Sequence, residues 1–309
     1  MNFTHIPVLL NECLSGLCIK PDGIYVDGTA GGGGHSFEIA KQLKNGKLIC
    51  IDRDSEAIAA LKQRLSEFDD KIIFVQDNYK NLPDILDRLE IQKIDGILLD
   101  LGVSSHQLDT ATRGFSYRFD APLDMRMNVN KGQTAADIVN EYPLQKLANV
   151  ISEYGEEKYA YSIAKNIVKK REEQKIKTTF ELTEIIKSSM PFSAMKNRHP
   201  SKKTFQALRI EVNGELSAIS TLMENIVSVL NKDARIVIIS FHSLEDRIVK
   251  IALNELAKGC ICSKELPVCI CHNTPKIELI TKKPITASEE ELSTNKRSSS
   301  AKLRIAKKL

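Results

Sequence analysis

Residues 24–36 read IYVDGTAGGGGHS, and the rest of the chain is best interpreted from this stretch outward. Three residues suited to a buried strand lead to Asp27, and five glycines lie between Gly28 and Gly34. Residues 36–44 then show the apolar spacing of a helix. A glycine turn between a strand and a helix brings the backbone close to a ligand, and the free N–H groups of the helix start point toward it. The alternative is a flexible linker, which would not stand between a buried strand and an amphipathic helix.

The composition is that of an ordinary globular protein. Of the 309 residues, 42% are hydrophobic and 27% are charged. The first residues lack the basic and apolar regions of a signal peptide, and no apolar run approaches the roughly 20 residues that span a bilayer. Seven cysteines, an odd number, favour a reducing cytoplasm over a disulfide framework. The net charge of +4 permits a nucleic-acid partner without requiring one. We therefore expect a cytoplasmic protein.

Predicted strands and helices alternate over the first part of the chain. The strands are 24–27, 47–52, 71–76 and 94–100, and the helices are 36–44, 55–67 and 81–89. Continuous apolar strands joined by helices indicate a parallel sheet covered on both faces, which is a doubly wound α/β fold. Further on, the pattern predicts a fifth strand over 235–240, a helix over 243–256, and short strands at 277–281 and 302–306 that suit a closing antiparallel hairpin.

Acidic residues stand where the predicted strands end. Asp27, Asp52 and Asp100 end the first, second and fourth strands, and Asp77 follows the third. Ligands of such sheets lie beyond the carboxyl ends of the strands. Asp52 has the spacing from the glycine turn at which an acid contacts ribose hydroxyls. Asp54 is the alternative for that role, although it also suits a helix cap.

The glycine turn matches neither common phosphate-binding motif. It does not follow G-x-G-x-x-G, and it lacks the lysine followed by serine or threonine of a P-loop. Several carboxylates would repel a pyrophosphate but attract a cation. S-adenosylmethionine carries a sulfonium, an ammonium and an adenosine without phosphate, so it fits these residues.

The alternation stops after the fourth strand for about a hundred residues, which is longer than a loop in a compact domain. Helices are predicted over 134–140, 143–152, 156–173 and 179–188, followed by a longer helix over 205–230. We interpret residues 109–206 as an inserted helical domain for substrate recognition, between core segments 1–108 and 207–309.

Basic residues gather in the insertion and at the C-terminus. The insertion holds two groups, which are Lys165, Lys169, Lys170, Arg171, Lys175 and Lys177, and then Lys196, Arg198, Lys202, Lys203 and Arg209. The tail from Lys296 onward has six basic residues and no acid. A lysine-rich helix face is often only solvated, but beside a cofactor site a surface for RNA phosphates is the better interpretation. Residues 113–119 interleave arginines and aromatics, which would either stack on a single strand or pack the insertion onto the core.

Four cysteines lie close together near the C-terminus, at Cys260, Cys262, Cys269 and Cys271. In a reducing compartment such a set can hold a structural zinc ion in a tetrahedral thiolate site. The C-x-C spacing is less usual than C-x-x-C, so uncoordinated or redox-labile thiols are the alternative.

Six longer motifs resemble one family. They are residues 27–36 (DGTAGGGGHS), 99–109 (LDLGVSSHQLD), 122–127 (PLDMRM), 205–213 (FQALRIEVN), 240–247 (SFHSLEDR) and 297–304 (RSSSAKLR). Together they resemble the RsmH/MraW family, the S-adenosylmethionine-dependent methyltransferases of cytosine N4 in the decoding region of 16S ribosomal RNA. The resemblance implies a class I, Rossmann-like methyltransferase fold with an inserted helical domain.

The resemblance also implies site residues and a partner. The implied cofactor contacts are Gly33, Gly34, His35, Asp52, Tyr79, Asp100 and Gln107. Tyr79 stands at an aromatic position of the family and would offer a flat face to the adenine, whereas His106 stands where proline is common and is given no role. The implied partner is 16S ribosomal RNA within the small ribosomal subunit, and a comparison of methylation of naked RNA with that of the assembled subunit would decide which form is the substrate. The oligomeric state stays open, a homodimer included.

Methyl transfer to an exocyclic amine needs in-line positioning and an acceptor for the amine proton. Known amino-methyltransferases place an acid or amide, prolines and an aromatic after the fourth strand, but residues 100–105 here read DLGVSS. The candidate acceptors are therefore Asp100, the backbone carbonyls after it, Ser104 and His242. The alternative role for His242 is to cap its helix. The target base must leave its stack to reach the site.

Two other functions remain open at this point. One is an RNA-binding assembly factor on a degenerate methyltransferase fold, which the intact acids and glycine turn disfavour. The other is a small-molecule methyltransferase, which the basic insertion and tail disfavour.

Overall fold

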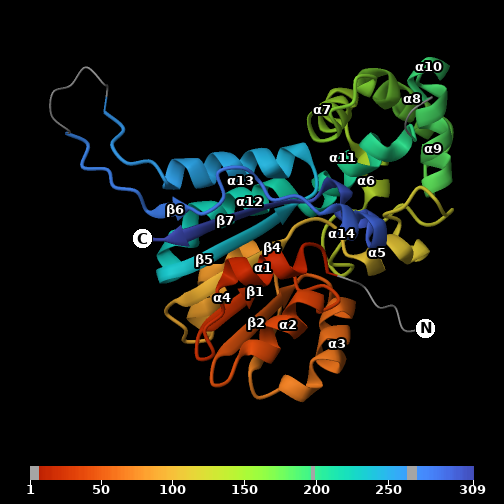
Figure 1. Ribbon diagram of the computed structural model, residues 1–309. Coiled ribbons are helices and arrows are strands. Elements are labelled where there is room, and N and C mark those ends of the chain that lie inside the picture. Colours follow the sequence, from red (N-terminus) through yellow and green to blue (C-terminus); the bar gives the residue numbers. More distant parts are fainter. Residues whose placement is uncertain (1–6, 196–198, 263–269) are drawn as a thin grey trace. The chain divides into compact units, whose positions relative to one another are not determined.

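The computed structural model describes residues 7–195, 199–262 and 270–309. The chain divides into two compact units (Figure 1). The core unit comprises Met1–Gly102 and Leu216–Leu309, and the insertion unit comprises Val103–Glu215. From the sequence we placed these boundaries at 108/109 and 206/207. The insertion unit extends further because the last helix before its end, α11 (Ser201–Asn213), buries Phe205 and Leu208 in the hydrophobic core of that unit.

A seven-stranded sheet with the order β3-β2-β1-β4-β5-β7-β6 forms the centre of the core unit (Figure 1). The strands are β1 (Ile24–Asp27), β2 (Lys47–Asp52), β3 (Ile72–Gln76), β4 (Ile94–Asp100), β5 (Leu230–Ser240), β6 (Ile277–Leu279) and β7 (Lys302–Lys308). Strands β1 to β5 run parallel, while β7 is antiparallel to both β5 and β6. This arrangement confirms the predicted doubly wound sheet with its closing antiparallel hairpin, the fold class of the class I methyltransferases.

Helices cover both faces of the sheet because the strand side chains alternate between two hydrophobic clusters. Val26, Ile49 and Ile97 pack with helices α4, α12 and α13, whereas Leu48 and Leu98 pack with α1, α2 and α3. Each fully buried side chain of this kind stabilises the fold by roughly 1.5–3 kcal/mol. The helices of the core unit are α1 (Leu10–Leu17), α2 (Gly34–Gln42), α3 (Ser55–Arg64), α4 (Leu82–Arg88), α12 (Glu215–Asn225), α13 (Ser243–Leu256) and α14 (Glu289–Thr294).

The insertion unit is helical around its own core. Its helices are α5 (Ser105–Asp109), α6 (Ala135–Glu141), α7 (Leu144–Gly155), α8 (Ala160–Glu173), α9 (Thr179–Ser188), α10 (Phe192–Met195) and α11 (Ser201–Asn213). Capping boxes at Thr134 and Thr178 start α6 and α9, which explains why the sequence located both helices well.

Two of the predicted helices differ most from the observed ones. The helix expected over 205–230 is not continuous, because Gly214 adopts the left-handed conformation (φ 58°) and ends α11. The helix expected over 156–173 begins only at Ala160, since Glu156 is itself left-handed (φ 48°) and ends α7. Neither break contains a proline, so the apolar spacing of the sequence predicted both helices to be longer than they are.

None of the helices within the described ranges is long and apolar enough to cross a membrane.

The basic C-terminal residues belong largely to strand β7 and are not a loose tail. Arg304 is 8% exposed and donates from Nε to Asp246 Oδ1 of α13 at 2.7 Å. Lys302 Nζ also lies 3.4 Å from Asp246 Oδ2, and Lys307 Nζ lies 2.9 Å from Glu278 Oε2 of β6. These ion pairs fasten the closing hairpin to the sheet and to α13.

Replacing Arg304 should therefore destabilise the core unit. We expect Arg304→Met to lower the free energy of unfolding in urea by about 2–4 kcal/mol, since the buried Asp246 carboxylate loses its main partner. The matched control is Lys307→Met on the same strand, whose pair with Glu278 is more exposed and should cost less than about 1 kcal/mol. Equal losses in the two variants would contradict a special role for the buried pair.

Candidate active site

The glycine turn is held in shape by the acid that ends the neighbouring strand. The Gly31 N–H donates to Asp52 Oδ2 at 2.8 Å, and the Asp54 N–H donates to Asp52 Oδ1 at 2.8 Å. Gly33 is left-handed (φ 75°) at the start of α2, a conformation that costs glycine little. A Cβ on Gly34 would lie 2.5 Å from Pro7 Cγ, so no larger residue fits there without a shift. The turn is therefore a fixed cradle rather than a flexible linker.

Asp27 holds the strand before the turn to the helix after it. Its side chain is buried, and its Oδ2 accepts a hydrogen bond from Ser36 Oγ of α2 at 2.6 Å. Its Oδ1 accepts from the Thr29 N–H at 3.3 Å. Burial raises the pKa of Asp27 to about 6, and nearby Asp52 adds to the increase. Sequence reasoning missed Ser36 as a partner because nothing in the pattern shows which way its hydroxyl points.

Asp100, at the end of the adjacent strand β4, has few polar partners of its own. Its Oδ1 is buried without a hydrogen-bond partner among the described residues. Its Oδ2 lies 3.9 Å from His35 Nδ1, and its backbone N–H donates to Thr29 Oγ1 at 2.6 Å. Burial raises the pKa of Asp100 to about 8, with further increases from Asp27 and Glu245. A negative charge here is therefore poorly compensated by the protein alone.

His35 presents an acceptor to Asp100. Its Nε2 lies 3.0 Å from the Val8 carbonyl oxygen. Because a carbonyl oxygen only accepts, Nε2 carries the proton, and in the neutral ring Nδ1 turns a lone pair toward the Asp100 carboxyl. At 3.9 Å the two groups lie beyond the distance of a hydrogen bond.

The other strand-end acids fall into two kinds. Burial raises the pKa of Asp52 to about 6. Asp77 behaves oppositely, because hydrogen bonds from the Asn78 backbone, from Asn81 and from Arg88 outweigh its burial and hold its pKa below the usual value. Arg88 Nη2 lies 2.8 Å from Asp77 Oδ2, so this acid already has its own cation. Three acids, Asp27, Asp52 and Asp100, therefore share an uncompensated site beside the glycine turn.

The structure shows where Asp54 and Tyr79, two further residues considered from the sequence, lie. Asp54 is the N-cap of α3, where its Oδ1 accepts from the Glu56 N–H at 3.1 Å, so the helix-cap alternative is confirmed. Tyr79 is 8% exposed and lies against Gly28, since a Cβ on that glycine would approach Tyr79 Cβ to 3.2 Å. The Cβ atom of Tyr79 thus lies next to the beginning of the glycine turn, and the contact of its ring with adenine stays a prediction.

The family model of the MraW methylase family matches residues 2–309.

The chain belongs to this family. Three relatives named ribosomal RNA small subunit methyltransferase H align with the whole chain. The relative from Finegoldia magna is 52% identical over 311 residues, that from Clostridium botulinum (strain Kyoto / Type A2) 53% over 310, and that from Clostridioides difficile 51% over 311. Each alignment covers 100% of this chain and 100% of the relative.

His242, in a motif that resembles the family, is the N-cap of α13. It follows β5, whose Ile239 is paired with Asp100 in the sheet, so His242 and Asp100 leave adjacent strands at the same edge. The Glu245 N–H donates to His242 Nδ1 at 3.4 Å, and His242 Nε2 lies 3.1 Å from Glu245 Oε1. The structure thus gives His242 the helix-capping geometry that the sequence left as an alternative, and its part in proton transfer stays a prediction.

Glu245 is a site residue whose electrostatic role sequence reasoning missed. It is 1% exposed, and its Oε2 accepts from the Phe241 N–H at 2.8 Å. Its charge also contributes to the raised pKa of Asp100. The available signal was its position three residues after His242, which is the spacing of a capping box.

Ser104 and Gln107 lie in the insertion unit and bind each other. Ser104 Oγ accepts from the Gln107 N–H at 3.2 Å, and Gln107 Oε1 accepts from the Ser104 N–H at 3.1 Å, which forms the capping box of α5. Their predicted roles, proton acceptor for Ser104 and cofactor contact for Gln107, stay predictions.

Several of the basic residues proposed to contact RNA instead stabilise the insertion unit. Arg171 Nη1 donates to the carbonyls of Val139 and Tyr142, at 2.9 and 2.8 Å. Arg209 forms a bidentate pair with Glu215, and Lys203 Nζ donates to the Glu156 carbonyl. Lys196 and Arg198 lie outside the described residues. The exposed lysines that remain are Lys165, Lys169, Lys170, Lys175, Lys177 and Lys202, of which Lys170 pairs with Glu173.

The arginine and aromatic segment 113–119 mostly packs within the insertion unit. Arg113 is buried and donates to the Arg126 and Met127 carbonyls, both at 3.1 Å. Phe115 is buried, and Tyr117 stacks on His199 with ring centroids 4.1 Å apart. Of this segment, only Arg118 and Phe119 are exposed.

The raised pKa of Asp100 makes a prediction about stability. Unfolded Asp100 ionises near its usual pKa, whereas the folded group holds its proton to about pH 8, so its contribution to stability is lost as pH rises through this window. Asparagine does not ionise, so the free energy of unfolding of Asp100→Asn minus that of wild type should increase by about 1–3 kcal/mol from about pH 4 to about pH 9. This increase is smaller than the pKa difference alone would give, because the Asp100 side chain is 24% exposed.

The matched control is Asp77→Asn, measured by urea unfolding across the same pH series. Asp77 has a lowered pKa, so its variant should be less stable than wild type at neutral pH, and the difference should shrink as pH falls. A difference between wild type and Asp100→Asn that does not change with pH would contradict the uncompensated charge.

Proposed function

We propose that this chain transfers a methyl group from S-adenosylmethionine to the exocyclic N4 of a cytidine in the decoding region of 16S ribosomal RNA, in the bacterial cytoplasm. Membership of the methylase family and the name of its relatives, ribosomal RNA small subunit methyltransferase H, support the reaction class and the RNA. The choice of cytosine N4 rests on the motifs that resemble the family.

The observation that carries the proposal is the set of three poorly compensated carboxyl groups beside the glycine turn. Asp27, Asp52 and Asp100 all have raised pKa values, and Asp100 Oδ1 is buried without a partner among the described residues. A ligand with two positive charges and no phosphate would stabilise these acids in their ionised form. When bound, S-adenosylmethionine supplies a methyl group on a positively charged sulfur.

The residues of the turn fit such a cofactor. We assign the contacts to Gly33, Gly34, His35, Asp52, Tyr79, Asp100 and Gln107. Both oxygens of Asp52 already accept backbone N–H groups, which fixes the orientation of the carboxylate. Each oxygen retains a second lone pair that can accept a ribose hydroxyl.

We assign removal of the amine proton to groups at the ends of β4 and β5. The amine nitrogen attacks the methyl carbon, the carbon–sulfur bond breaks with its electron pair left on sulfur, and the nitrogen then loses a proton to a base. Transfer of the methyl group removes the sulfonium charge that favours the ionised acids, so a buried carboxylate beside it then accepts the proton more readily than an ordinary one. We assign this role to Asp100, with Ser104 and His242 as the other candidates.

Exposed lysines of the insertion unit supply the charge for binding RNA. Lys165 and Lys169 lie on α8, and Lys175, Lys177 and Lys202 lie elsewhere in the unit. Contacts of this kind recognise phosphates rather than sequence, so binding should weaken with increasing salt.

The test is transfer of a tritiated methyl group to small ribosomal subunits and to protein-free 16S RNA from a strain that lacks this enzyme. Nuclease digestion followed by mass spectrometry should identify N4-methylcytidine. Label in another nucleoside would refute the proposed acceptor atom, and efficient transfer to free cytidine would favour a small-molecule methyltransferase. Absence of S-adenosylmethionine binding in calorimetry would favour a binding module instead.

Cofactor affinity should depend on pH. The acids must ionise to receive a cation, so affinity for S-adenosylmethionine should rise by about tenfold or more between about pH 6 and pH 8. S-adenosylhomocysteine lacks the sulfonium and should show a smaller increase. Calorimetry would measure both, with Asp100→Asn expected to flatten the profile and Asp77→Asn expected to preserve it. Equal pH dependence for the two ligands would contradict a carboxylate contact with the sulfonium.

Two variants separate the capping role of His242 from a chemical one. Asparagine is a good N-cap without an imidazole, whereas alanine removes the cap at a cost of about 0.5–2 kcal/mol. If His242 takes part in proton transfer, His242→Asn and His242→Ala should both lower kcat by about 100-fold or more while KM for S-adenosylmethionine changes little. Near wild-type kcat in His242→Asn would assign this histidine to the helix alone.

A further inference from the structure

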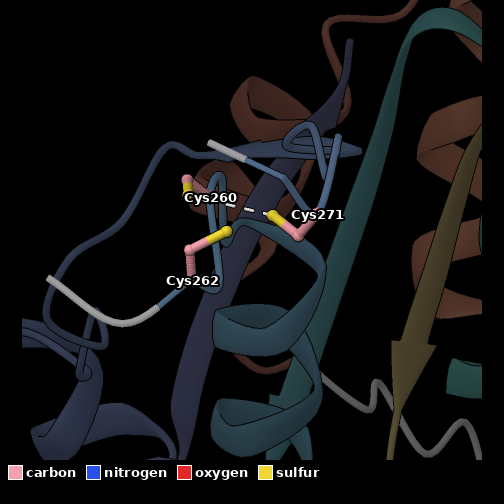
Figure 2. Close-up of side chains that lie close together, drawn as sticks. All are labelled: Cys260, Cys262 and Cys271. Carbon is pink, nitrogen blue, oxygen red and sulfur yellow. Dashed lines mark hydrogen bonds between the residues drawn. The ribbon is translucent and has the colours of Figure 1, made fainter. Parts of the chain in front are cut away.

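Three cysteines converge in the segment between α13 and β6 (Figure 2). Cys260 and Cys262 follow α13, and Cys271 precedes β6. Their Sγ atoms all lie within 4.8 Å of one another, and those of Cys260 and Cys271 are 3.8 Å apart. None of the three forms a disulfide. Figure 2 shows the three side chains pointing toward a common centre from two separate stretches of backbone.

The backbone around these cysteines donates hydrogen bonds to sulfur. The Ile261 N–H lies 3.3 Å from Cys271 Sγ, and the Ile270 N–H lies 3.4 Å from Cys262 Sγ. The Asn273 N–H adds a second contact to Cys271 Sγ at 3.5 Å. Peptide N–H donors of this kind orient metal-bound thiolates and offset their negative charge.

The two stretches are tied together at their base. Asn273 Nδ2 donates to the carbonyls of Lys258 and Gly259, at 3.1 and 2.6 Å, and the Lys276 N–H donates to the Leu256 carbonyl at 2.8 Å. These bonds hold the two stretches that carry the cysteines near one another.

No hydrophobic core supports the described part of this segment. Ile261 and Ile270, the apolar residues beside the cysteines, are 65% and 67% exposed. Where a short segment cannot bury apolar surface, a bound metal ion can supply the missing folding free energy. Three exposed or half-buried thiols gathered on such a segment therefore need an explanation other than packing.

We propose that Cys260, Cys262 and Cys271 bind a structural Zn²⁺ ion. A tetrahedral zinc ion with zinc–sulfur distances of about 2.3 Å places its sulfur ligands about 3.8 Å apart. The Cys260–Cys271 separation of 3.8 Å equals this tetrahedral edge. In an iron–sulfur cubane each cysteine binds a different iron atom, which spreads the sulfurs farther apart.

The proposal is limited to these three ligands. Cys269, the fourth cysteine that the sequence predicted for this site, lies outside the described residues. The site is also independent of the proposed methyl transfer, because none of its ligands belongs to the glycine turn or to the strand-end acids.

The test is the metal content of the full chain purified without chelator, measured by plasma mass spectrometry. Wild type should carry about one zinc ion per chain, and Cys262→Ser and Cys271→Ser should each retain less than about half of that. The matched control is Cys18→Ser, since Cys18 is exposed on the core unit and its Sγ donates to the nearby Ser15 carbonyl at 3.2 Å. This control should keep its zinc.

A second measurement keeps the proposal testable if a cysteine variant fails to fold. Wild type exchanged with Co²⁺ should show the visible bands of tetrahedral cobalt and the charge-transfer band of cobalt–thiolate bonds. Zinc below about a tenth of an equivalent in wild type, or equal zinc in wild type and both variants, would overturn the proposal. Iron with acid-labile sulfide would also overturn it, as would a disulfide formed between these cysteines in protein freshly purified under reducing conditions.

Discussion

Burial of several carboxyl groups at one edge of a parallel sheet is the constraint on which this structure depends. Parallel strands end at the same edge, so the acids that end β1, β2 and β4 are brought together by topology alone. Burial and repulsion from neighbouring carboxylates raise their pKa values, and of the acids at the strand ends only Asp77 pairs with an arginine in the described part of the chain. Such a site costs stability in the free protein and gains it when a cationic ligand binds, which is a common compromise at functional sites.

The glycine turn depends on the same acids. Asp52 accepts a hydrogen bond from the Gly31 N–H, and Asp27 accepts one from the Ser36 hydroxyl. Both carboxyl groups therefore fix the conformation of the turn and also give the site its negative charge. This double use explains why the turn is rigid despite its glycines. The glycines remove steric barriers, as Gly34 does beside Pro7, while the acids supply the order that glycine lacks.

Charge serves different purposes in different parts of the chain. In the closing hairpin, Arg304 is buried against Asp246 and contributes to the fold. In the insertion unit, Arg171 satisfies backbone carbonyls, whereas Lys165 and Lys169 on the same helix are exposed and available to a polyanion. The arginines thus tend to hold structure through several directed hydrogen bonds, and the lysines remain at the surface as hydrated point charges.

The sequence by itself determined the strands β1, β2 and β4 and the helices α9 and α13 to the residue, because continuous apolar runs and capping residues are local signals. It also determined which acids end the strands. The break at Gly214 and the late start of α8 were missed, since a single left-handed residue leaves the apolar period unchanged. Only the tertiary structure decided which acid has a partner, which basic residues are exposed, and that Glu245 lies close enough to influence Asp100. These properties depend on distance and burial between residues far apart in the chain, and neither quantity is encoded in local spacing.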